Sequence, residues 1–481
     1  MTYLGIDLGT SSVKLLLIDD AQRIIGSQSA ELQISRPLSG FSEQDPADWI
    51  AATRQGAQAL RTAHPVAFAA IRGIGLSGQM HGATALGADD GVLRPSILWN
   101  DTRSHAEAAA LDADPRFRAI SGNIVFPGFT APKLVWMRNH EPDLFARVAK
   151  VLLPKDYLRL WLTGEHVSDM SDAAGTSWLD TGKRDWSDDL LEASGMGRDQ
   201  MPRLVEGTEV SGHLRAELLS EWGLSGPVAV AGGAGDNAAA ACGMGTVAAG
   251  RAFVSLGTSG VLFAANDRYR PRPESAVHAF CHALPQTWHQ MGVILSATDA
   301  LNWHARTSRE SPAALVAELG STLRTPGVTF LPYLSGERTP HNDATIRGAF
   351  VGLDHATDRA ALTQAVLEGV AFAIRDNLEA LRAAGTELTA VTAVGGGARS
   401  HYWLGILATV LGLPVALPAD GDFGAAFGAA RLGLIAATGA DPLDVLTPPE
   451  TDRIFAPEPA LRDAFDHAYA RYRALYPALR D

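Results

Sequence analysis

Apolar runs separated by short polar turns begin close to the N-terminus of the chain. Tyr3 to Ile6 is apolar, Gly9 to Ser12 is a turn of small residues, and Val13 to Ile18 is apolar again before a polar turn at Asp19. Two short apolar runs joined by a small-residue turn are typical of a β-hairpin. The pattern therefore predicts that the chain opens with a pair of antiparallel strands.

Helical periodicity alternates with further strand candidates along the sequence. Apolar residues recur at helical spacing over 46–63, behind Asp45 as a capping residue, and a second amphipathic helix is predicted over 364–381. The strand candidates at 67–76 and 93–99 run into polar clusters, SGQMHG and NDTR. This alternation predicts an α/β fold, in which such strand ends commonly bind ligands.

The turn of the first hairpin occurs a second time in the chain. Asp7 to Ser12 (DLGTSS) and Ser255 to Gly260 (SLGTSG) are near copies, and apolar strand candidates at 252–255 and 261–264 flank the second copy. Matching turns in matching contexts indicate a duplicated fold. We therefore expect two related domains, residues 1–245 and residues 246–481.

Other glycine-rich or polar segments interrupt the second half. The strand candidate 388–394 ends in GGGARS, and Gly421 to Gly424 precedes a small-residue helix over 425–437. Small residues there predict a close approach, either of the helix to a sheet or of the backbone to a ligand. The segment LSGERTP around Arg338 has the composition of a surface turn.

Composition narrows the class of protein and of partner. The chain has 481 residues, 46% hydrophobic and 19% charged, and its net charge is −13, which argues against disorder and against binding of nucleic acid or anionic membranes. No signal-peptide pattern and no membrane-length apolar run is present. With only Cys242 and Cys281 as cysteines, we expect a cytoplasmic protein that acts on small molecules.

The two LGTS turns carry groups suited to binding phosphate. Backbone N–H groups and hydroxyls form a concave donor surface, and Lys14 adds a positive charge beside the first turn. The alternative is an ordinary hairpin turn. The spacing of the glycines in 232–245 excludes a dinucleotide-binding motif, and no Walker A motif occurs.

Two aspartates follow strand candidates. Asp236 suits a general base that orients a hydroxyl for phosphoryl transfer, with a helix-capping role as the alternative. Asp7 suits a Mg²⁺ ion held through water, or else a simple turn. Met80 and His81 offer an apolar wall and a hydrogen-bonding tip for a polyol, and Trp99 offers a stacking plane.

Together these motifs resemble the FGGY family of carbohydrate kinases. The first family signature is matched over 128–140, and the second over 348–353 and 362–368, with a departure at Ala361, where the family usually has a polar residue. The resemblance runs from about Tyr3 to about Leu434. It implies an α/β fold of duplicated actin-like (ribonuclease H-like) ATPase domains with a catalytic cleft between the domains.

The resemblance also implies roles for individual residues. Asp236 would be the catalytic base, and Asp7 would hold Mg²⁺ through water and be important for activity. The implied substrate-binding residues are Met80, His81, Trp99, Asp236 and Asn237. The implied phosphate and ATP contacts are Thr10, Ser11, Lys14, Gly257, Thr258, Gly396 and Gly397.

The implied activity is phosphorylation of the 5-hydroxyl of D-xylulose by ATP, with Mg²⁺, in pentose catabolism. Two alternatives stay open at this point. One is a kinase for another ketose or polyol, such as L-ribulose, gluconate or glycerol. The other is an actin-like interaction protein that uses the nucleotide as a switch. The sequence does not fix the oligomeric state, and a homodimer is compatible with it.

Overall fold

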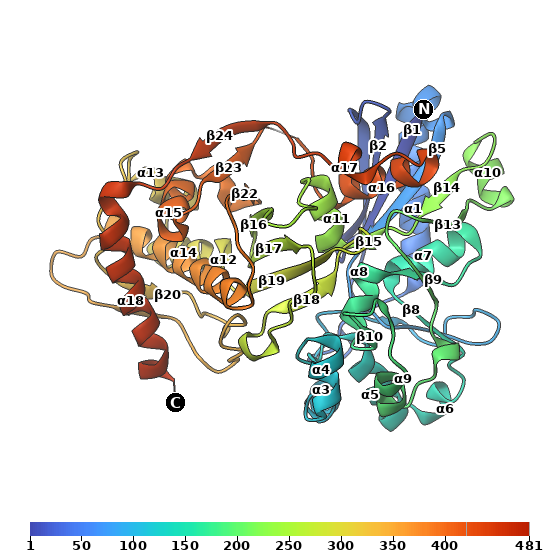
Figure 1. Cartoon of the computed structure of the whole chain (residues 1–481), viewed down its shortest axis with the longest axis horizontal. Helices are drawn as coiled ribbons and strands as arrows, with labels where there is room; N and C mark the ends of the chain where they lie inside the picture. Colours follow the sequence, from blue (N-terminus) through green and yellow to red (C-terminus); the bar gives the residue numbers. More distant parts are fainter. Residues whose placement is uncertain (420, 481) are drawn as a thin grey trace.

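The computed structural model describes residues 1–419 and 421–480, which form two sheet-centred lobes (Figure 1). The first lobe is built on a seven-stranded sheet. In spatial order its strands are β13 (Val210–His213), β14 (Ala229–Ala231), β5 (Ile71–Gly78), β1 (Thr2–Leu8), β2 (Ser12–Asp19) and β3 (Ile24–Glu31), with β15 (Ala234–Gly235) paired to β5.

The second lobe is built on another seven-stranded sheet. In spatial order its strands are β18 (His278–Cys281), β19 (Trp288–Ile294), β17 (Gly260–Asn266), β16 (Ala252–Leu256), β22 (Val391–Val394), β23 (Val415–Pro418) and β24 (Thr451–Phe455). The predicted strands on either side of each LGTS turn are present, as β1 and β2 and as β16 and β17, and each pair is antiparallel.

The two sheets share one pairing pattern, which confirms the duplication. From β3 through β2, β1, β5 and β14 to β13 the pairings are antiparallel, antiparallel, parallel, parallel and antiparallel. The same order of pairings runs from β19 through β17, β16, β22 and β23 to β24. The two LGTS turns therefore occupy equivalent places, because each joins the two strands of its sheet that come first in the chain, β1 and β2 or β16 and β17.

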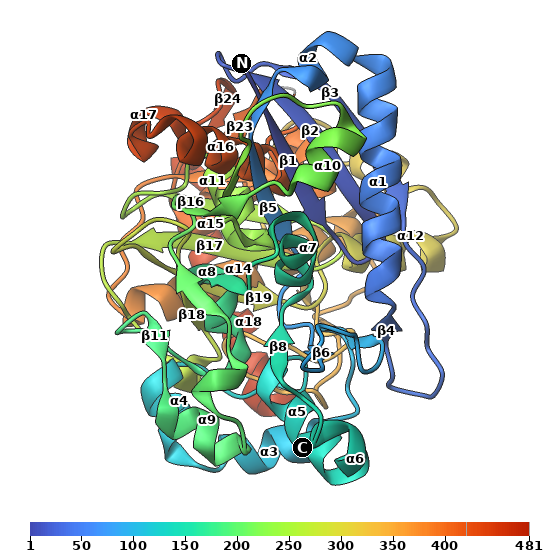
Figure 2. The ribbon, with the colours of Figure 1, turned by 90° about the vertical axis from the view of Figure 1, so that its right-hand side faces the viewer.

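Helices cover both sheets. The predicted helix 46–63 is α1 (Pro46–Ala63), which contacts β2 and β3 on the outer face of the first sheet (Figure 2). Its apolar stripe buries Trp49, Ala57 and Leu60, as the spacing predicts. The predicted helix 364–381 extends to α14 (Arg359–Ala383), because Asp358 caps it at an earlier residue.

Further helices and short strand pairs complete the two lobes. The helices of the first half are α2 (Pro65–Ala69), α3 (His105–Asp112), α4 (Pro115–Ser121), α5 (Thr130–His140), α6 (Pro142–Phe145), α7 (Pro154–Thr163), α8 (Met170–Ala173), α9 (Asp188–Ser194), α10 (Ala216–Trp222) and α11 (Asp236–Gly243). Those of the second half are α12 (Thr298–Ser308), α13 (Pro312–Ala317), α15 (His401–Leu411), α17 (Pro442–Val445) and α18 (Arg462–Leu479). The short pairs are β4 (Glu43–Gln44) with β7 (Ser96–Ile97), β6 (Thr84–Leu86) with β8 (Lys150–Leu152), β9 (Val167–Asp169) with β12 (Arg203–Val205), β10 (Leu179–Asp180) with β11 (Asp185–Trp186), and β20 (Thr329–Leu331) with β21 (Ala349–Val351).

The small-residue helix of the second half is α16 (Ala425–Thr438), and it packs on the first sheet. Gly75 of β5 lies so close to α16 that an added Cβ would come 1.7 Å from the carbonyl oxygen of Ala429. In Figure 1, α16 and α17 lie over β1 and β5, beside the first lobe. The small residues thus serve the approach of helix to sheet, and a segment of the second half joins the two lobes.

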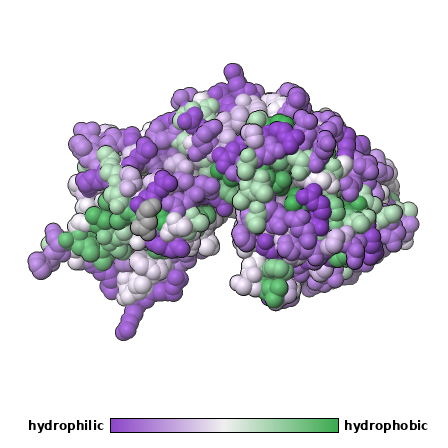
Figure 3. All heavy atoms as spheres, turned by 90° about the horizontal axis from the view of Figure 1, so that it is seen from below, coloured by the Kyte–Doolittle hydropathy of each residue, from purple (hydrophilic) through white to green (hydrophobic). Residues whose placement is uncertain are grey.

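A groove separates the lobes on one face of the molecule. Seen from below, the surface is deeply indented between them (Figure 3). Among the described residues, no helix is long and apolar enough to cross a membrane.

Candidate active site

The first LGTS turn is held by hydrogen bonds to its neighbours. Thr10 Oγ1 donates to Gln79 Oε1 at 3.2 Å, and Trp99 Nε1 donates to Thr10 Oγ1 at 2.9 Å. Lys14 points across to the second half of the sequence and forms an ion pair with Asp422. The turn, the loop after β5 and the loop before α16 therefore meet at one place.

Asp236 begins α11 and is partly buried, with the carboxylate of Asp7 as an acidic neighbour. The N-cap of that helix is Gly235, so Asp236 does not occupy the capping position. Its Oδ1 accepts hydrogen bonds from the backbone and side-chain nitrogens of Asn237, at 2.7 and 2.9 Å. Burial and the neighbouring carboxylate of Asp7 raise the pKa of Asp236 to about 7. A carboxylate with this pKa is suited to exchange a proton near neutral pH.

Asp7 is the penultimate residue of β1 and lies near Asp236. Ser77 donates a hydrogen bond to Asp7 Oδ1 at 2.9 Å. Burial raises the pKa of Asp7, although Ser77 and the positive charge of Lys14 oppose the shift. Asp7 and Asp236 are two partly buried carboxylates, and the charge of Asp7 acts on Asp236. A divalent cation neutralises such a pair of carboxylates.

The Met80-His81 loop lies directly beside the Asp236 segment. An added Cβ on Gly235 would come 2.9 Å from Met80 Cγ, so the methionine side chain lies against the residue before Asp236. His81 has a φ of +70°, a left-handed conformation that is uncommon outside glycine and typical of functional sites. The structure thus brings together Met80, His81 and Asp236.

The hydrogen bond of His81 defines which of its nitrogens is free. The carbonyl oxygen of Gly175 lies 2.7 Å from His81 Nδ1. Because a carbonyl oxygen can only accept a hydrogen bond, Nδ1 carries the ring proton and is the donor. Burial lowers the pKa of His81 to about 3, with Lys133 and Arg338 adding to the shift. The ring is therefore neutral, and Nε2 is an acceptor for a hydroxyl.

The second LGTS turn and the glycine-rich segment lie at neighbouring strand ends. Strands β16 and β22 are parallel, so Gly257 and Thr258 follow one strand while Gly396 and Gly397 follow its neighbour. The Thr298 backbone N–H and side-chain hydroxyl both donate to the carbonyl oxygen of Gly257, at 2.9 and 2.7 Å. These predicted nucleotide-binding glycines form one backbone-rich rim.

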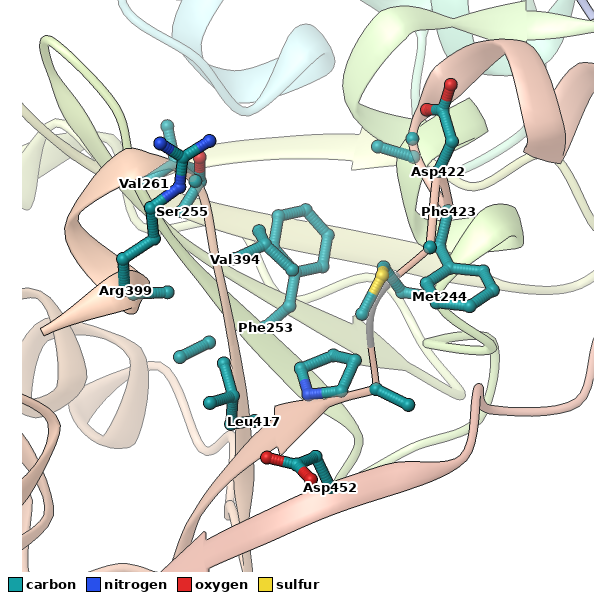
Figure 4. A pocket seen from close by; sticks show the side chains of 18 of the residues that line it. Met244, Phe253, Ser255, Val261, Val394, Arg399, Leu417, Asp422, Phe423 and Asp452 are labelled. Atoms are coloured by element: carbon teal, nitrogen blue, oxygen red, sulfur yellow. The ribbon is translucent and has the colours of Figure 1, made fainter. Parts of the chain in front are cut away.

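A pocket of about 830 Å³ opens next to this rim (Figure 4). Asn237 and Ala240 of α11 line it together with Met244, which follows that helix. Residues of the second half line the rest, including Gly395, Arg399 and Asp422. Met244 and Phe423 lie on one side in Figure 4, and Arg399 and Ser255 lie on the other. The pocket lies at the junction of the two halves, as expected for an interdomain cleft. Asn237 lines this pocket, and its expected place beside the substrate stays a prediction.

The expectation of a surface turn at Arg338 is wrong. Glu337 is buried, and Arg338 packs its guanidinium 4.1 Å from the ring centre of Phe126. Glu337 accepts hydrogen bonds from the backbone of Leu295 and Arg338, which fixes the segment inward. The sequence LSGERTP is typical of a turn, but a contact between the two halves buries it.

Two family models match the chain in succession. The N-terminal domain of the FGGY family of carbohydrate kinases matches residues 2–243, and its C-terminal domain matches residues 252–437. The chain belongs to the FGGY family of carbohydrate kinases. The expected enzyme class is thereby confirmed: this FGGY kinase is an ATP-dependent sugar kinase rather than an interaction protein.

Individual relatives of this FGGY kinase cover nearly its whole length. It is 48% identical to a xylulose kinase of Escherichia coli (strain K12) over 479 residues, which is 97% of this chain and 98% of the relative. The crystal structure of a protein described as a xyloylose kinase from Brucella ovis is 70% identical, covers 100% of this chain and 99% of its own, and has a TM-score of 0.99. A xylulose kinase structure from Rhodospirillum rubrum is 30% identical, with a TM-score of 0.93 and coverage of 100% and 99%.

These matches confirm the fold class of the FGGY kinase as a duplicated actin-like ATPase fold. The boundary expected at residues 245 and 246 stays a prediction, and α16 is the element of the second half that packs on the first sheet.

Sequence reasoning missed several residues that shape this site. Asp422 pairs with Lys14 across 408 positions of sequence, a separation that no local pattern reveals. Gly175 selects the tautomer of His81 from a segment 94 positions away in the sequence, which no local pattern reveals either. The polar clusters at strand ends were the informative signal, and they located Asp7, His81 and Asp236.

Proposed function

We propose that this FGGY kinase transfers the γ-phosphoryl group of ATP to the 5-hydroxyl of D-xylulose, giving D-xylulose 5-phosphate and ADP in pentose catabolism. The observation that carries the proposal is the partly buried Asp236 carboxylate beside Met80 and His81, in a chain similar to xylulose kinases over nearly its full length. The cytoplasmic location and the homodimer compatible with the sequence stay predictions.

In the proposed reaction, Asp236 accepts the proton of the sugar hydroxyl as the oxygen attacks the γ-phosphorus. Met80 provides an apolar wall, His81 Nε2 accepts a hydrogen bond from a second hydroxyl, and Trp99 flanks the sugar beside Thr10. Phosphoryl transfer needs positioning of the two reactants more than strong basicity. The raised pKa of Asp236 allows the same group to take up that proton near neutral pH.

The proposed nucleotide site uses both halves of the chain. The second turn and the glycine rim, Gly257, Thr258, Gly396 and Gly397, would contact the nucleotide next to the pocket. Thr10, Ser11 and Lys14 would contact the transferred phosphate from the opposite lobe. Asp7 would hold Mg²⁺ through water, and the ion, when bound, neutralises charge on the phosphate oxygens. The partly buried Asp7 and Asp236 carboxylates fit such a cation.

A substrate panel tests the proposal. ADP release would be measured with ATP and Mg²⁺ in the presence of D-xylulose, L-ribulose, gluconate or glycerol. We expect strong stimulation by D-xylulose alone. Stimulation by one of the other three compounds but not by D-xylulose would replace the proposed substrate, and no stimulation by any of them would refute the proposal.

Substitution of His81 by alanine tests the sugar contact. We expect the KM for D-xylulose to rise about fivefold, since one hydrogen bond to a neutral group contributes about 1 kcal/mol. The KM for ATP should stay within twofold, because the Met80-His81 loop lies on the sugar side of Asp236. An unchanged KM for D-xylulose would contradict the assignment of His81 to the sugar.

Substitution of Lys14 by alanine tests the first turn as a phosphate site. We expect the KM for ATP to rise about tenfold with little change in melting temperature, since half-exposed ion pairs such as Lys14 with Asp422 contribute little to stability. Lys183→Ala is the matched control, because Lys183 also pairs with an aspartate, Asp180, on the exposed surface. Loss of folding in Lys14→Ala, with normal kinetics of the folded fraction, would favour a purely structural role.

A further inference from the structure

A fully buried ionic cluster lies behind the segment that carries Asp236. Lys155 Nζ lies 2.5 Å from Asp156 Oδ1, 2.7 Å from Asp169 Oδ1 and 3.3 Å from Asp172 Oδ2, and all four side chains have no exposed surface. Arg159, one helical turn after Lys155 in α7, lies 3.6 Å from Asp156. Such groups are expensive to bury, so their position needs an explanation.

The three carboxylates have the geometry of a cation site, but the cluster contains its own cations. Asp156, Asp169 and Asp172 lie close enough together to hold a metal ion. The ammonium of Lys155 already contacts all three of them. Burial raises the pKa of Asp172 well above its usual value, and the positive charge of Lys155 opposes this shift. Lys155 and Arg159 therefore supply positive charge to the three carboxylates, and we do not treat the cluster as a metal site.

The cluster holds the segment before Asp236 at both of its ends. Arg159 Nη1 donates to the carbonyl oxygen of Ala231 at 2.6 Å, and Nη2 donates to that of Gly232. At the other end, the Gly235 N–H donates to Ser171 Oγ at 3.1 Å, and Ser171 Oγ in turn donates to Asp169 Oδ2 at 2.5 Å. A continuous chain of contacts thus runs from Lys155 to the backbone of the residue before Asp236.

The same short segment also reaches the sugar side of the site. Ser171 lies in α8, and Gly175 lies in the following 3₁₀ turn (Ala174–Thr176), where its carbonyl oxygen accepts a hydrogen bond from His81 Nδ1. An added Cβ on Gly175 would come 2.5 Å from the His81 ring. One rigid stretch, residues 169–175, therefore contacts both the Asp236 segment and His81.

We propose that Ser171, held by Asp169 and Lys155, is a positioning residue that sets Asp236 against the hydroxyl that His81 helps to orient. The proposal rests on the proposed function for its kinetic consequence. Its structural part is independent, because the hydrogen bond from Gly235 to Ser171 exists whatever the substrate is. Loss of this bond frees the backbone next to Asp236, and small displacements of a reacting group cost large factors in rate.

Ser171→Ala removes the acceptor without adding volume. We expect kcat with D-xylulose to fall about 10-fold to 100-fold, while the KM for ATP changes less than twofold. Hydrogen exchange of the Gly235 amide should become faster. Ser171→Thr keeps the acceptor oxygen, and we expect it to restore most of kcat.

Ser194→Ala is the matched control. Ser194 is an equally buried serine that accepts a hydrogen bond from Trp178 Nε1 at 2.8 Å in α9, outside the Asp236 segment. We expect it to lower the melting temperature as much as Ser171→Ala does and to leave kcat within twofold. If Ser171→Ala does not fold, Ser171→Cys keeps the side-chain size with a weak sulfur acceptor and should show the same loss of kcat.

The outcomes separate this inference from the proposed function. A folded Ser171→Ala or Ser171→Cys protein with kcat within twofold of wild type, or with unchanged exchange at Gly235, would overturn the positioning role. A wild-type protein that phosphorylates none of the panel compounds would refute the proposed function instead, and the exchange measurement would still decide whether Ser171 holds the Asp236 segment.

Discussion

Replacement of Asp236 by asparagine should lower kcat by about two to four orders of magnitude and leave the protein folded. Asparagine keeps the shape of the side chain, but it cannot take up the proton of the sugar hydroxyl. Steady-state ADP release with saturating D-xylulose and ATP measures the effect. A variant with near-normal kcat would refute the role of Asp236 as the base.

The pH dependence of the wild-type enzyme belongs to the same prediction. Because the pKa of Asp236 is raised to about 7, the base becomes protonated as the pH falls below that value, and activity should be half-maximal near pH 7. His81, with a pKa of about 3, should add no second limb between pH 5 and 9. The residual activity of Asp236→Asn should lack the limb near pH 7.

Stability measurements distinguish a base from a structural aspartate. The folded state binds the proton of Asp236 more tightly than the unfolded state does, since the pKa of this group rises from 3.8 to about 7 on folding. The contribution of Asp236 to the free energy of unfolding is therefore present below about pH 4 and is lost as the pH rises through 7. At pH 8, Asp236→Asn should melt at the same temperature as wild type or higher. A marked fall would instead indicate a structural role.

Gly75→Ala should destabilise the protein by about 3 kcal/mol or more, because a Cβ there would come 1.7 Å from the Ala429 carbonyl oxygen of α16. Helix and sheet must separate to admit it. The loop before α16 carries Asp422, so its pairing with Lys14 should weaken and the KM for ATP should rise. Thermal unfolding and ATP kinetics measure the two effects.

Gly327→Ala is the control for this change. Nothing lies within 4 Å of an added Cβ at Gly327, so we expect wild-type stability and kinetics. Equal melting temperatures for Gly75→Ala and wild type would show that α16 does not pack on the first sheet as described.

Local patterns were sufficient to predict the framework of the site. The repeated LGTS turn predicted both hairpins, and the period of Trp49, Ala57 and Leu60 predicted the ends of α1 correctly. The polar clusters at strand ends identified Asp236 and His81, because parallel neighbouring strands bring their ends to one edge of a sheet.

What could not be predicted depends on contacts between distant segments. Arg338 was expected on the surface, since its segment has the composition of a turn. The expectation failed because Arg338 packs on Phe126 only when the two halves come together. The pairing of Lys14 with Asp422 and the return of α16 to the first sheet have the same origin. The contacts of Lys155 with Asp169 and Asp172 could not be predicted either, because they form only when α7 packs beside the segment that leads into α8.

The central claim is tested most directly by the structure of the product. Purified protein would be incubated with ATP, Mg²⁺ and D-xylulose labelled with ¹³C, and the product would be examined for coupling between ¹³C and ³¹P. The proposed reaction predicts coupling to phosphorus at carbon 5 and an equal amount of ADP. Phosphate on another carbon, or ADP formed without a phosphorylated sugar, would contradict it.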